Sequence, residues 1–209
     1  MIQKRKYFIY LLTSLLLGGC AADQIDYNTL RFSPKVQVKS FEALAAKPIK
    51  PDEKEYVIGL GEKPWEVLQI GKERVFATKL SMEPAKYPFG VRIVSKGKGG
   101  FFVPKLFFLG AKNQIIKATD VKDFRFDRGI LKGTVFVNKN YNKIRSIVVT
   151  QELNNKKKTY QISHIQTAVV PVYAGPYLFN INTASGDKNV TMRHTYAADI
   201  KLSIHSFRE

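Results

Sequence analysis

The stretch AADIKLSIHSF, residues 197–207, alternates apolar and polar side chains along its length. Successive side chains of a β-strand point to opposite sides, so Ile200, Leu202 and Ile204 fall on one face of an extended chain. Charged and hydroxyl side chains fill the other face. The stretch therefore predicts a half-buried strand, with one face on a hydrophobic core and the other toward solvent.

Similar short runs follow one another from Glu55 onward, separated by Gly, Pro and Asn turns. They are EYVIGL, RVFATKLSM, FGVRIVSKG, DFRFDRG, ILKGTVFV and IRSIVVTQ. GFFVPKLFFLG predicts a buried strand with Pro104 at an edge or a bulge. Because no run keeps a 3.6-residue period, the sequence predicts a mainly β fold, an antiparallel β-sandwich of the jelly-roll or immunoglobulin-like kind.

Two segments fit this alternation less well. Residues 21–53 contain three prolines and predict a tether that docks partly on the domain, with one strand in RFSPKVQVKS and a helical turn in FEALAAKPIK. Residues 159–193 predict a short helix or turn near YQISHIQTA and then a long loop containing PVYAGPYLFNINTASGDKN. A loop of that length in a compact domain is often functional.

The N-terminal residues have the layout of an export signal. A basic cluster, residues 4–6, precedes an apolar run at residues 7–17, which is shorter than the roughly 20 residues that a spanning helix needs. LGGC, residues 17–20, resembles the lipobox of bacterial lipoproteins, and Cys20 is the only cysteine. The resemblance implies cleavage before Cys20, lipid on its thiol and, since no aspartate follows it, attachment to the outer membrane on the periplasmic side.

These features predict three parts: a signal peptide at 1–19, a lipid anchor and tether at 20–53, and a sandwich domain at 54–209. A single lipid-modified cysteine leaves no thiol for a disulfide. The domain is therefore expected to rest on its hydrophobic core, although the compartment would permit disulfides.

The charge is strongly positive, at +17 for the whole chain, and loss of the three basic signal residues lowers it to +14. Such a surplus favours anionic neighbours. Export makes nucleic acid an unsuitable partner. The expected partners are the membrane, through lipid on Cys20, an oligosaccharide or anionic envelope polymer, and an envelope transport protein. A lysine-coated soluble surface explains the charge equally well without a ligand.

The sequence has no recognised catalytic or metal-binding motif. The three histidines are His164, His194 and His205. Their spacing matches neither HExxH nor H-x₃-H, and the chain contains no G-x-S-x-G elbow or P-loop. Asp120, Asp123 and Asp127 lack the spacing of a calcium loop and are interpreted as solubilising charges at strand ends. We therefore expect a non-enzymatic protein without metal or cofactor.

Five residues are candidates for ligand binding. Trp65, Tyr173 and Tyr177 present the large rings on which the apolar faces of sugars stack. Arg193 and His194 precede the last strand, where the five donors of a guanidinium suit a carboxylate or a sugar. The alternative is structural: the rings pack in the core, and Arg193 clamps the carbonyls of an incoming loop.

Three longer segments resemble the maltose operon periplasmic protein family. They are RVFATKLSMEPAKYPFGVRIVSKGKGGFFVPKLFFLGAKNQ, FRFDRGILKGTVFVNKNYNKIRSIVVTQ and VTMRHTYAADIKLSI. The last matches the closing strand of that family at Arg193, His194, Thr195, Ile200, Lys201 and Leu202.

The resemblance covers roughly residues 74–204, and its motifs are structural. It implies an exported sandwich that serves maltose or maltodextrin transport without catalysis. The lipobox departs from the family's plain signals. An envelope scaffold whose basic surface binds an acidic polymer or protein is the alternative function.

Overall fold

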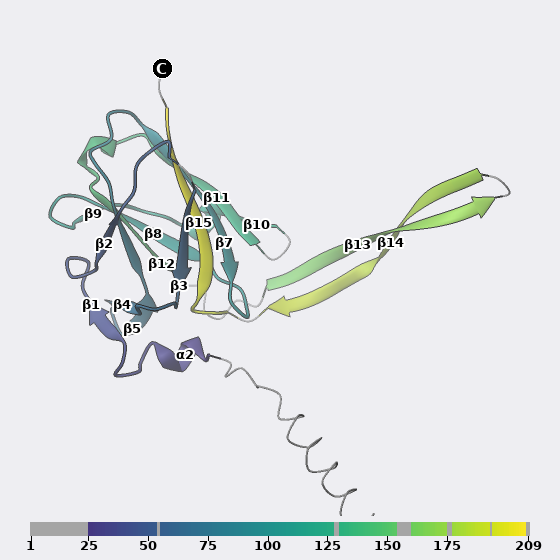
Figure 1. Ribbon diagram of the computed structural model, residues 1–209, viewed down its shortest axis with the longest axis horizontal. Helices are drawn as coiled ribbons and strands as arrows, with labels where there is room; N and C mark the ends of the chain where they lie inside the picture. Colours follow the sequence, from purple (N-terminus) through teal and green to yellow (C-terminus); the bar gives the residue numbers. More distant parts are fainter. Residues whose placement is uncertain are drawn as a thin grey trace, which may run out of the picture.

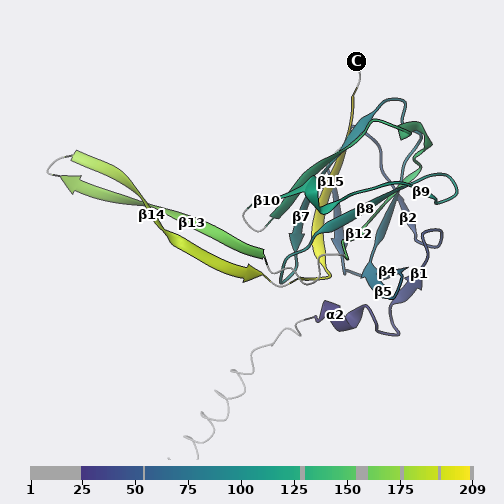
Figure 2. The ribbon, with the colours of Figure 1, turned by 180° about the vertical axis from the view of Figure 1, so that it is seen from behind.

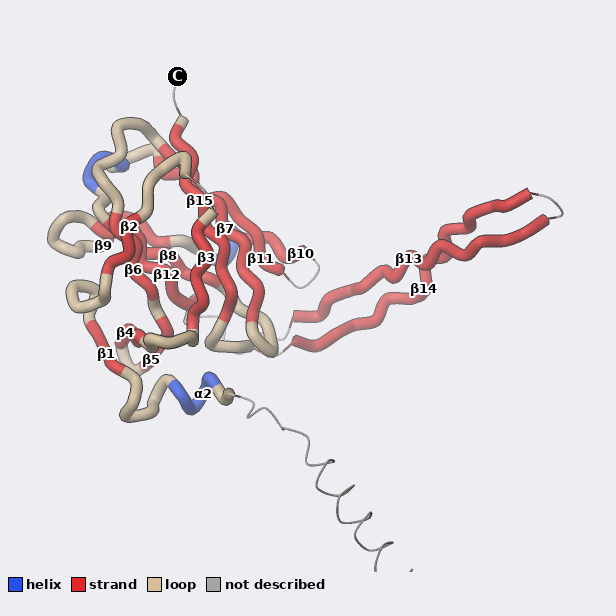
Figure 3. The backbone as a smooth tube through the Cα atoms, in the orientation of Figure 1, coloured by secondary structure: helices blue, strands red, loops and turns tan. Residues whose placement is uncertain are grey.

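The computed structural model describes residues 25–53, 55–127, 130–153, 160–174, 177–192 and 194–207, with backbone alone for 160–174 and 177–192. This part of the chain is mainly β, as the sequence predicts. Its strands form two packed five-stranded sheets, a smaller three-stranded sheet and a long two-stranded hairpin (Figure 1). Its helices are short: α2 (Tyr27–Leu30) and the 3₁₀ turns η1 (Val121–Asp123) and η2 (Tyr141–Lys143). Figure 3 shows how little of the described chain is helical.

One layer of the sandwich, the β15 sheet, is antiparallel throughout. Its strands, in spatial order, are β10 (Phe124–Asp127), β11 (Ile130–Val137), β7 (Phe89–Gly97), β15 (Ala198–Ser206) and β3 (Tyr56–Leu60). β15 thus lies between β7 and β3, and its inner residues Ile200, Leu202 and Ile204 are fully buried. The predicted strand and its inward face are confirmed.

The other layer, the β12 sheet, packs against these inward faces. Its strands, in spatial order, are β2 (Ala46–Pro48), β6 (Thr78–Ser81), β12 (Ser146–Gln151), β8 (Pro104–Leu109) and β9 (Ile115–Ala118). Leu80, Leu106 and Phe108 from this sheet belong to the same buried cluster as the three inward residues of β15. Pro104 is the first residue of β8, a position that needs no ladder donor and so tolerates proline.

The segment 25–53 contributes strands to the fold. β1 (Gln37–Lys39) pairs in parallel with β4 (Glu66–Ile70), and β4 pairs antiparallel with β5 (Glu73–Phe76) to complete a three-stranded sheet. β2 pairs in parallel with β6. Val36, Leu44 and Ile49 are buried. FEALAAKPIK contains one hydrogen-bonded turn, in which the Leu44 N–H donates to the carbonyl of Ser40 at 3.2 Å, followed by β2. Of RFSPKVQVKS only Gln37–Lys39 is a strand, and its pairing with β4 sets that length.

The prediction of a long loop within residues 159–193 was wrong. β13 (Tyr160–Ala174) and β14 (Tyr177–Met192) pair in antiparallel register along almost their whole length. Figures 1 and 2 show this hairpin projecting from one end of the sandwich. Period-2 alternation on either side of the Gly-Pro pair at 175–176 is the signal for a hairpin, and the proline in β13 concealed it.

Phe108→Ala should lower the free energy of unfolding by about 3–5 kcal/mol, because it leaves a cavity among fully buried residues of both sheets. Phe136→Ala is the matched control, since Phe136 is 53% exposed, and it should change stability by no more than about 0.5 kcal/mol. Denaturant unfolding of both variants measures the difference. Equal losses would contradict the placement of Phe108 between the sheets.

Candidate functional site

Two exposed phenylalanines meet on the outer face of the β15 sheet. Phe136 of β11 is 53% exposed and Phe207, just after β15, is 42% exposed. Their ring centroids lie 5.7 Å apart with an interplanar angle of 30°. Large apolar rings are normally covered, so this tilted pair forms an aromatic platform open to solvent.

Gly90 of β7 makes room for the aromatic platform. It lies between Phe136 and His205 in the register of the sheet. A Cβ atom on Gly90 would come within 3.1 Å of the tip of the Phe207 ring, so that ring crosses the strand where no side chain stands. The Phe207 N–H donates to the carbonyl of Pro88 at 2.9 Å and holds the chain end in place. The platform therefore depends on a glycine and on the C-terminal strand.

Polar side chains form the next row of the same face. Thr134, Arg92 and Ser203 lie side by side across β11, β7 and β15, about 7 Å from the aromatic platform. His205 Nε2 and Ser203 Oγ are 3.0 Å apart. The guanidinium of Arg92 has neither a hydrogen bond nor an ion pair with the described residues. A ligand on the rings would thus find a free guanidinium and two hydroxyl groups within reach.

A basic hollow of about 290 Å³ continues this row toward β10. The cationic side chains that line it are Arg92, Lys122, Arg125 and Lys132. Lys132 Nζ is paired with Asp127 at 2.7 Å, whereas the guanidinium of Arg125 has no hydrogen bond or ion pair with the described residues. The basic hollow suits a carboxylate or phosphate group better than a neutral one.

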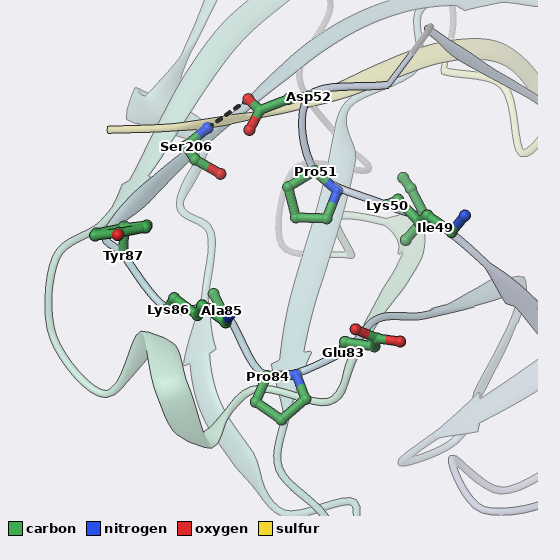
Figure 4. A pocket seen from close by; sticks show the side chains of 10 residues that line it. All are labelled: Ile49, Lys50, Pro51, Asp52, Glu83, Pro84, Ala85, Lys86, Tyr87 and Ser206. Carbon is green, nitrogen blue, oxygen red and sulfur yellow. Dashed lines mark hydrogen bonds between the residues drawn. The ribbon is translucent and has the colours of Figure 1, made fainter. Parts of the chain in front are cut away.

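A cleft of about 470 Å³ adjoins the aromatic platform at the rim of the sandwich. Figure 4 shows residues 49–52 and 83–87 on opposite sides of it. The backbone N–H of Ser206 donates to Asp52 Oδ1 at 2.9 Å on its upper edge in this view. Tyr87, 48% exposed, lies beside Pro88, which accepts from Phe207. The cleft extends the exposed aromatic surface around the end of the sheet.

Trp65, predicted as a sugar-stacking ring, is half-buried. It packs against the core, and its Nε1–H donates to the carbonyl of Gly61 at 3.0 Å. Lys63 Nζ lies 5.0 Å from the centre of its ring. With a lysine over the ring and its N–H satisfied, Trp65 has the contacts of a structural residue.

His194 lies at the other end of the sandwich from the aromatic platform. Its Nδ1 is 2.7 Å from Gln151 Nε2, and that amide also donates to the carbonyl of Thr195 at 2.6 Å. An amide donor at Nδ1 leaves the proton of a neutral imidazole on Nε2. Gln151 thus fastens the chain that enters β15 to the end of β12.

Lys98 lies beside this fastening and lines a hollow of about 610 Å³ together with His194. Burial opposes the charge on Lys98, but hydrogen bonds and attraction from Glu62 and Asp199 outweigh it and raise the pKa of this lysine above its usual value. Lys98 therefore stays protonated at neutral pH. Both carboxylates neutralise it, which makes it a poor anion receptor.

Arg193 and Cys20 lie outside the described residues, and the side chains of Tyr173 and Tyr177 on the hairpin are likewise outside the description. The structure brings His194 near the base of the hairpin and places Trp65 within a separate set of contacts. The predicted ligand-binding residues that can be placed do not form one site.

Sequence reasoning missed the aromatic platform. Phe136 occupies an outward position in ILKGTVFV, where alternation predicts a polar residue, and that mismatch is the one available signal. Phe207 directly follows the last strand, and only the register of β7, β11 and β15 brings it to Phe136.

Asp120 and Asp123 cap each other around η1, and Asp127 pairs with Lys132. The described residues include no cluster of His, Cys, Asp and Glu suited to a metal ion. Within the same part of the chain, no helix has the length and apolar character needed to cross a bilayer.

Comparisons with known proteins found no match to a family model, a curated protein or a solved structure. The resemblance to the maltose operon periplasmic protein family therefore stays a prediction from the sequence motifs.

Gln151→Leu should lower the free energy of unfolding by about 1–3 kcal/mol, because the carbonyl of Thr195 and Nδ1 of His194 lose their shared donor in a buried setting. Gln69→Leu is the control, since Gln69 donates to the carbonyl of Gly71 at the exposed surface and should change stability by no more than about 0.5 kcal/mol. Thermal and denaturant unfolding test both. A Gln151 variant as stable as the control would contradict a stabilising role for the hydrogen bonds of Gln151 to His194 and Thr195.

Proposed function

We propose that this protein is a non-catalytic, lipid-anchored protein of the bacterial periplasm that binds carbohydrate in support of its transport. Maltodextrin is the first ligand to test, because the sequence motifs resemble the maltose operon periplasmic protein family. The anchor is the lipid expected on Cys20, and the outer membrane is its expected location. An envelope transport protein is the expected protein partner.

The observation that carries the proposal is the aromatic platform. Sugar rings bury their apolar C–H faces on flat aromatic surfaces, and Phe136 and Phe207 present such a surface at 53% and 42% exposure. Hydroxyl and guanidinium groups in the next row supply the hydrogen bonds that orient a sugar. The rim cleft offers room for further units of an oligosaccharide.

The basic hollow favours a second candidate function. The guanidinium groups of Arg92 and Arg125 have no hydrogen bond or ion pair with the described residues, whereas Lys122 lies 3.9 Å from Asp120 and Asp123 adds one carboxylate to the lining. A polymer with carboxylate or phosphate groups would bind there by charge-assisted hydrogen bonds. Under this alternative the protein is an envelope scaffold that holds an acidic polymer or protein partner.

Binding is tested by calorimetry with maltohexaose and, separately, with an oligogalacturonate. Each stacked ring covers roughly 50 Å² of apolar surface, or about 1 kcal/mol, so the double variant Phe136→Ala, Phe207→Ala should bind maltohexaose at least about tenfold more weakly. Ile115→Ala removes an exposed apolar side chain from β9 of the other sheet and should bind like the wild type.

The two candidate functions separate in the same experiment. Under the carbohydrate function, the affinity for maltohexaose should not fall when salt is added, and it should fall in the double variant without the Phe136 and Phe207 rings. The scaffold alternative requires oligogalacturonate binding that weakens with salt and with Arg92→Ala. No binding of either ligand by the folded wild type would reject the carbohydrate function and a scaffold for polymeric carboxylates.

Lipid attachment is tested by mass spectrometry of the mature protein. The expected N-terminus is Cys20 with a diacylglyceryl group and an amide-linked acyl chain, because two or more chains give stable anchoring where one chain binds only marginally. Cys20→Ala should leave an unprocessed precursor. An unmodified Cys20, or cleavage at another bond, would exclude the anchor.

A further inference from the structure

The β13–β14 hairpin stands apart from the sandwich. Among the described elements, β13 and β14 pack extensively only on each other, and Figures 1 and 2 show them extending away from both sheets. A two-stranded hairpin on its own is at best marginally stable in water. A ribbon this long is therefore expected to bury a face against something outside the sandwich.

The register of the hairpin sorts its distal residues onto two different faces. Directly paired residues share a face, and this places Val170 with Ile181, Val172 with Phe179, and Ala174 with Tyr177 on one side. We call these six residues the apolar face.

The opposite face is mixed in character. It carries Asn182 opposite Val169, Asn180 opposite Pro171 and, nearest the turn, Leu178 opposite Tyr173. The hairpin is thus amphipathic, with two asparagines on one side and only apolar or aromatic residues on the other.

The distal hairpin also lacks charge. Residues 165–186 contain no Lys, Arg, His, Asp or Glu, although 24% of the whole chain is charged and its net charge is +17. A hairpin that served as a solvated arm would need charge for solubility and to discourage edge pairing. The absence of charge over this stretch points to an apolar surrounding.

The position of the hairpin base identifies that surrounding as a membrane. Residues 25–28 and His194, two positions after β14, line one hollow, so the N-terminal segment and the hairpin base meet at the same end of the sandwich. Cys20 precedes Ile25 by five positions, a reach of at most about 18 Å. A lipid on Cys20, which is part of the proposed function, would hold this end against the bilayer.

We infer that the β13–β14 hairpin lies on the surface of the bilayer that holds the anchor, with its apolar face at the boundary of the acyl chains. Tyr177, on the apolar face near the turn, suits this interface, where amphipathic rings are enriched. The positive charge of the protein adds attraction to anionic headgroups. The unpaired strand edges stay within reach of water and headgroups, which the hydrocarbon interior would not allow.

The test compares two single variants of the mature, lipidated protein in vesicles of phosphatidylethanolamine and phosphatidylglycerol. Phe179→Trp puts a fluorophore on the apolar face, and Asn180→Trp puts one on the opposite face of the same strand. The wild type supplies the background from Trp65, the only tryptophan. Lipids brominated on their acyl chains should quench and blue-shift the emission added by Phe179→Trp and leave that added by Asn180→Trp largely unchanged.

A second pair of variants tests whether the apolar face binds vesicles when the lipid anchor is missing. The mature chain from residue 21, which retains every described residue, should float with the same vesicles. Val172→Asp with Phe179→Asp should abolish flotation, whereas Asn180→Asp with Asn182→Asp adds the same charge on the other face and should preserve most of it. Vesicles without phosphatidylglycerol carry no anionic headgroup and so remove simple charge attraction. The difference in flotation between the two aspartate pairs should persist with these vesicles.

Three results would overturn the inference. They are equal quenching of the two tryptophan variants, equal loss of flotation in the two aspartate pairs, and a vesicle-independent dimer that Val172→Asp with Phe179→Asp dissociates. The dimer would assign the apolar face to a second copy of the chain. Because flotation uses a chain without lipid and measures no sugar, the inference and the proposed function can fail separately.

Discussion

The pairing of β15 with both β7 and β3 is the constraint on which the rest of the structure depends. β15 lies inside its sheet, so its register is set from both sides, and Ile200, Leu202 and Ile204 are committed to the core. A slip of one residue would turn these three outward and bring charged and hydroxyl groups inside. Burial of one face thus specifies the register far more strongly than backbone hydrogen bonds alone.

The same register builds the candidate site. Once the inner residues of β15 face the β12 sheet, His205 must face outward, beside Gly90 and Phe136. The missing side chain at Gly90 lets the Phe207 ring cross the strand and reach Phe136. Burial of the inner face of β15 therefore fixes the position of the aromatic platform on the outer face. The buried residues and the platform residues are different ones.

The two ends of β15 have different surroundings. One end meets the fastening of Gln151 to His194, close to the N-terminal segment and the hairpin, and the other ends beside the rim cleft and the aromatic platform. Nine extended residues separate these ends by about 30 Å. Under the proposed anchoring through Cys20, the hairpin would lie close to the membrane and the platform would lie at the end of the sandwich away from it.

Alternation along the chain by itself determined the β class, most of the strands between Glu55 and Gln151 and the inward face of β15, because these follow from the two-residue period of a single extended segment. The order of strands, the docking of β1 and β2 and the straight hairpin in place of a loop were decided by pairing between distant segments. The aromatic platform belongs to that second group. Phe136 and Phe207 come together only when β11, β7 and β15 are in register, and no local pattern carries that information.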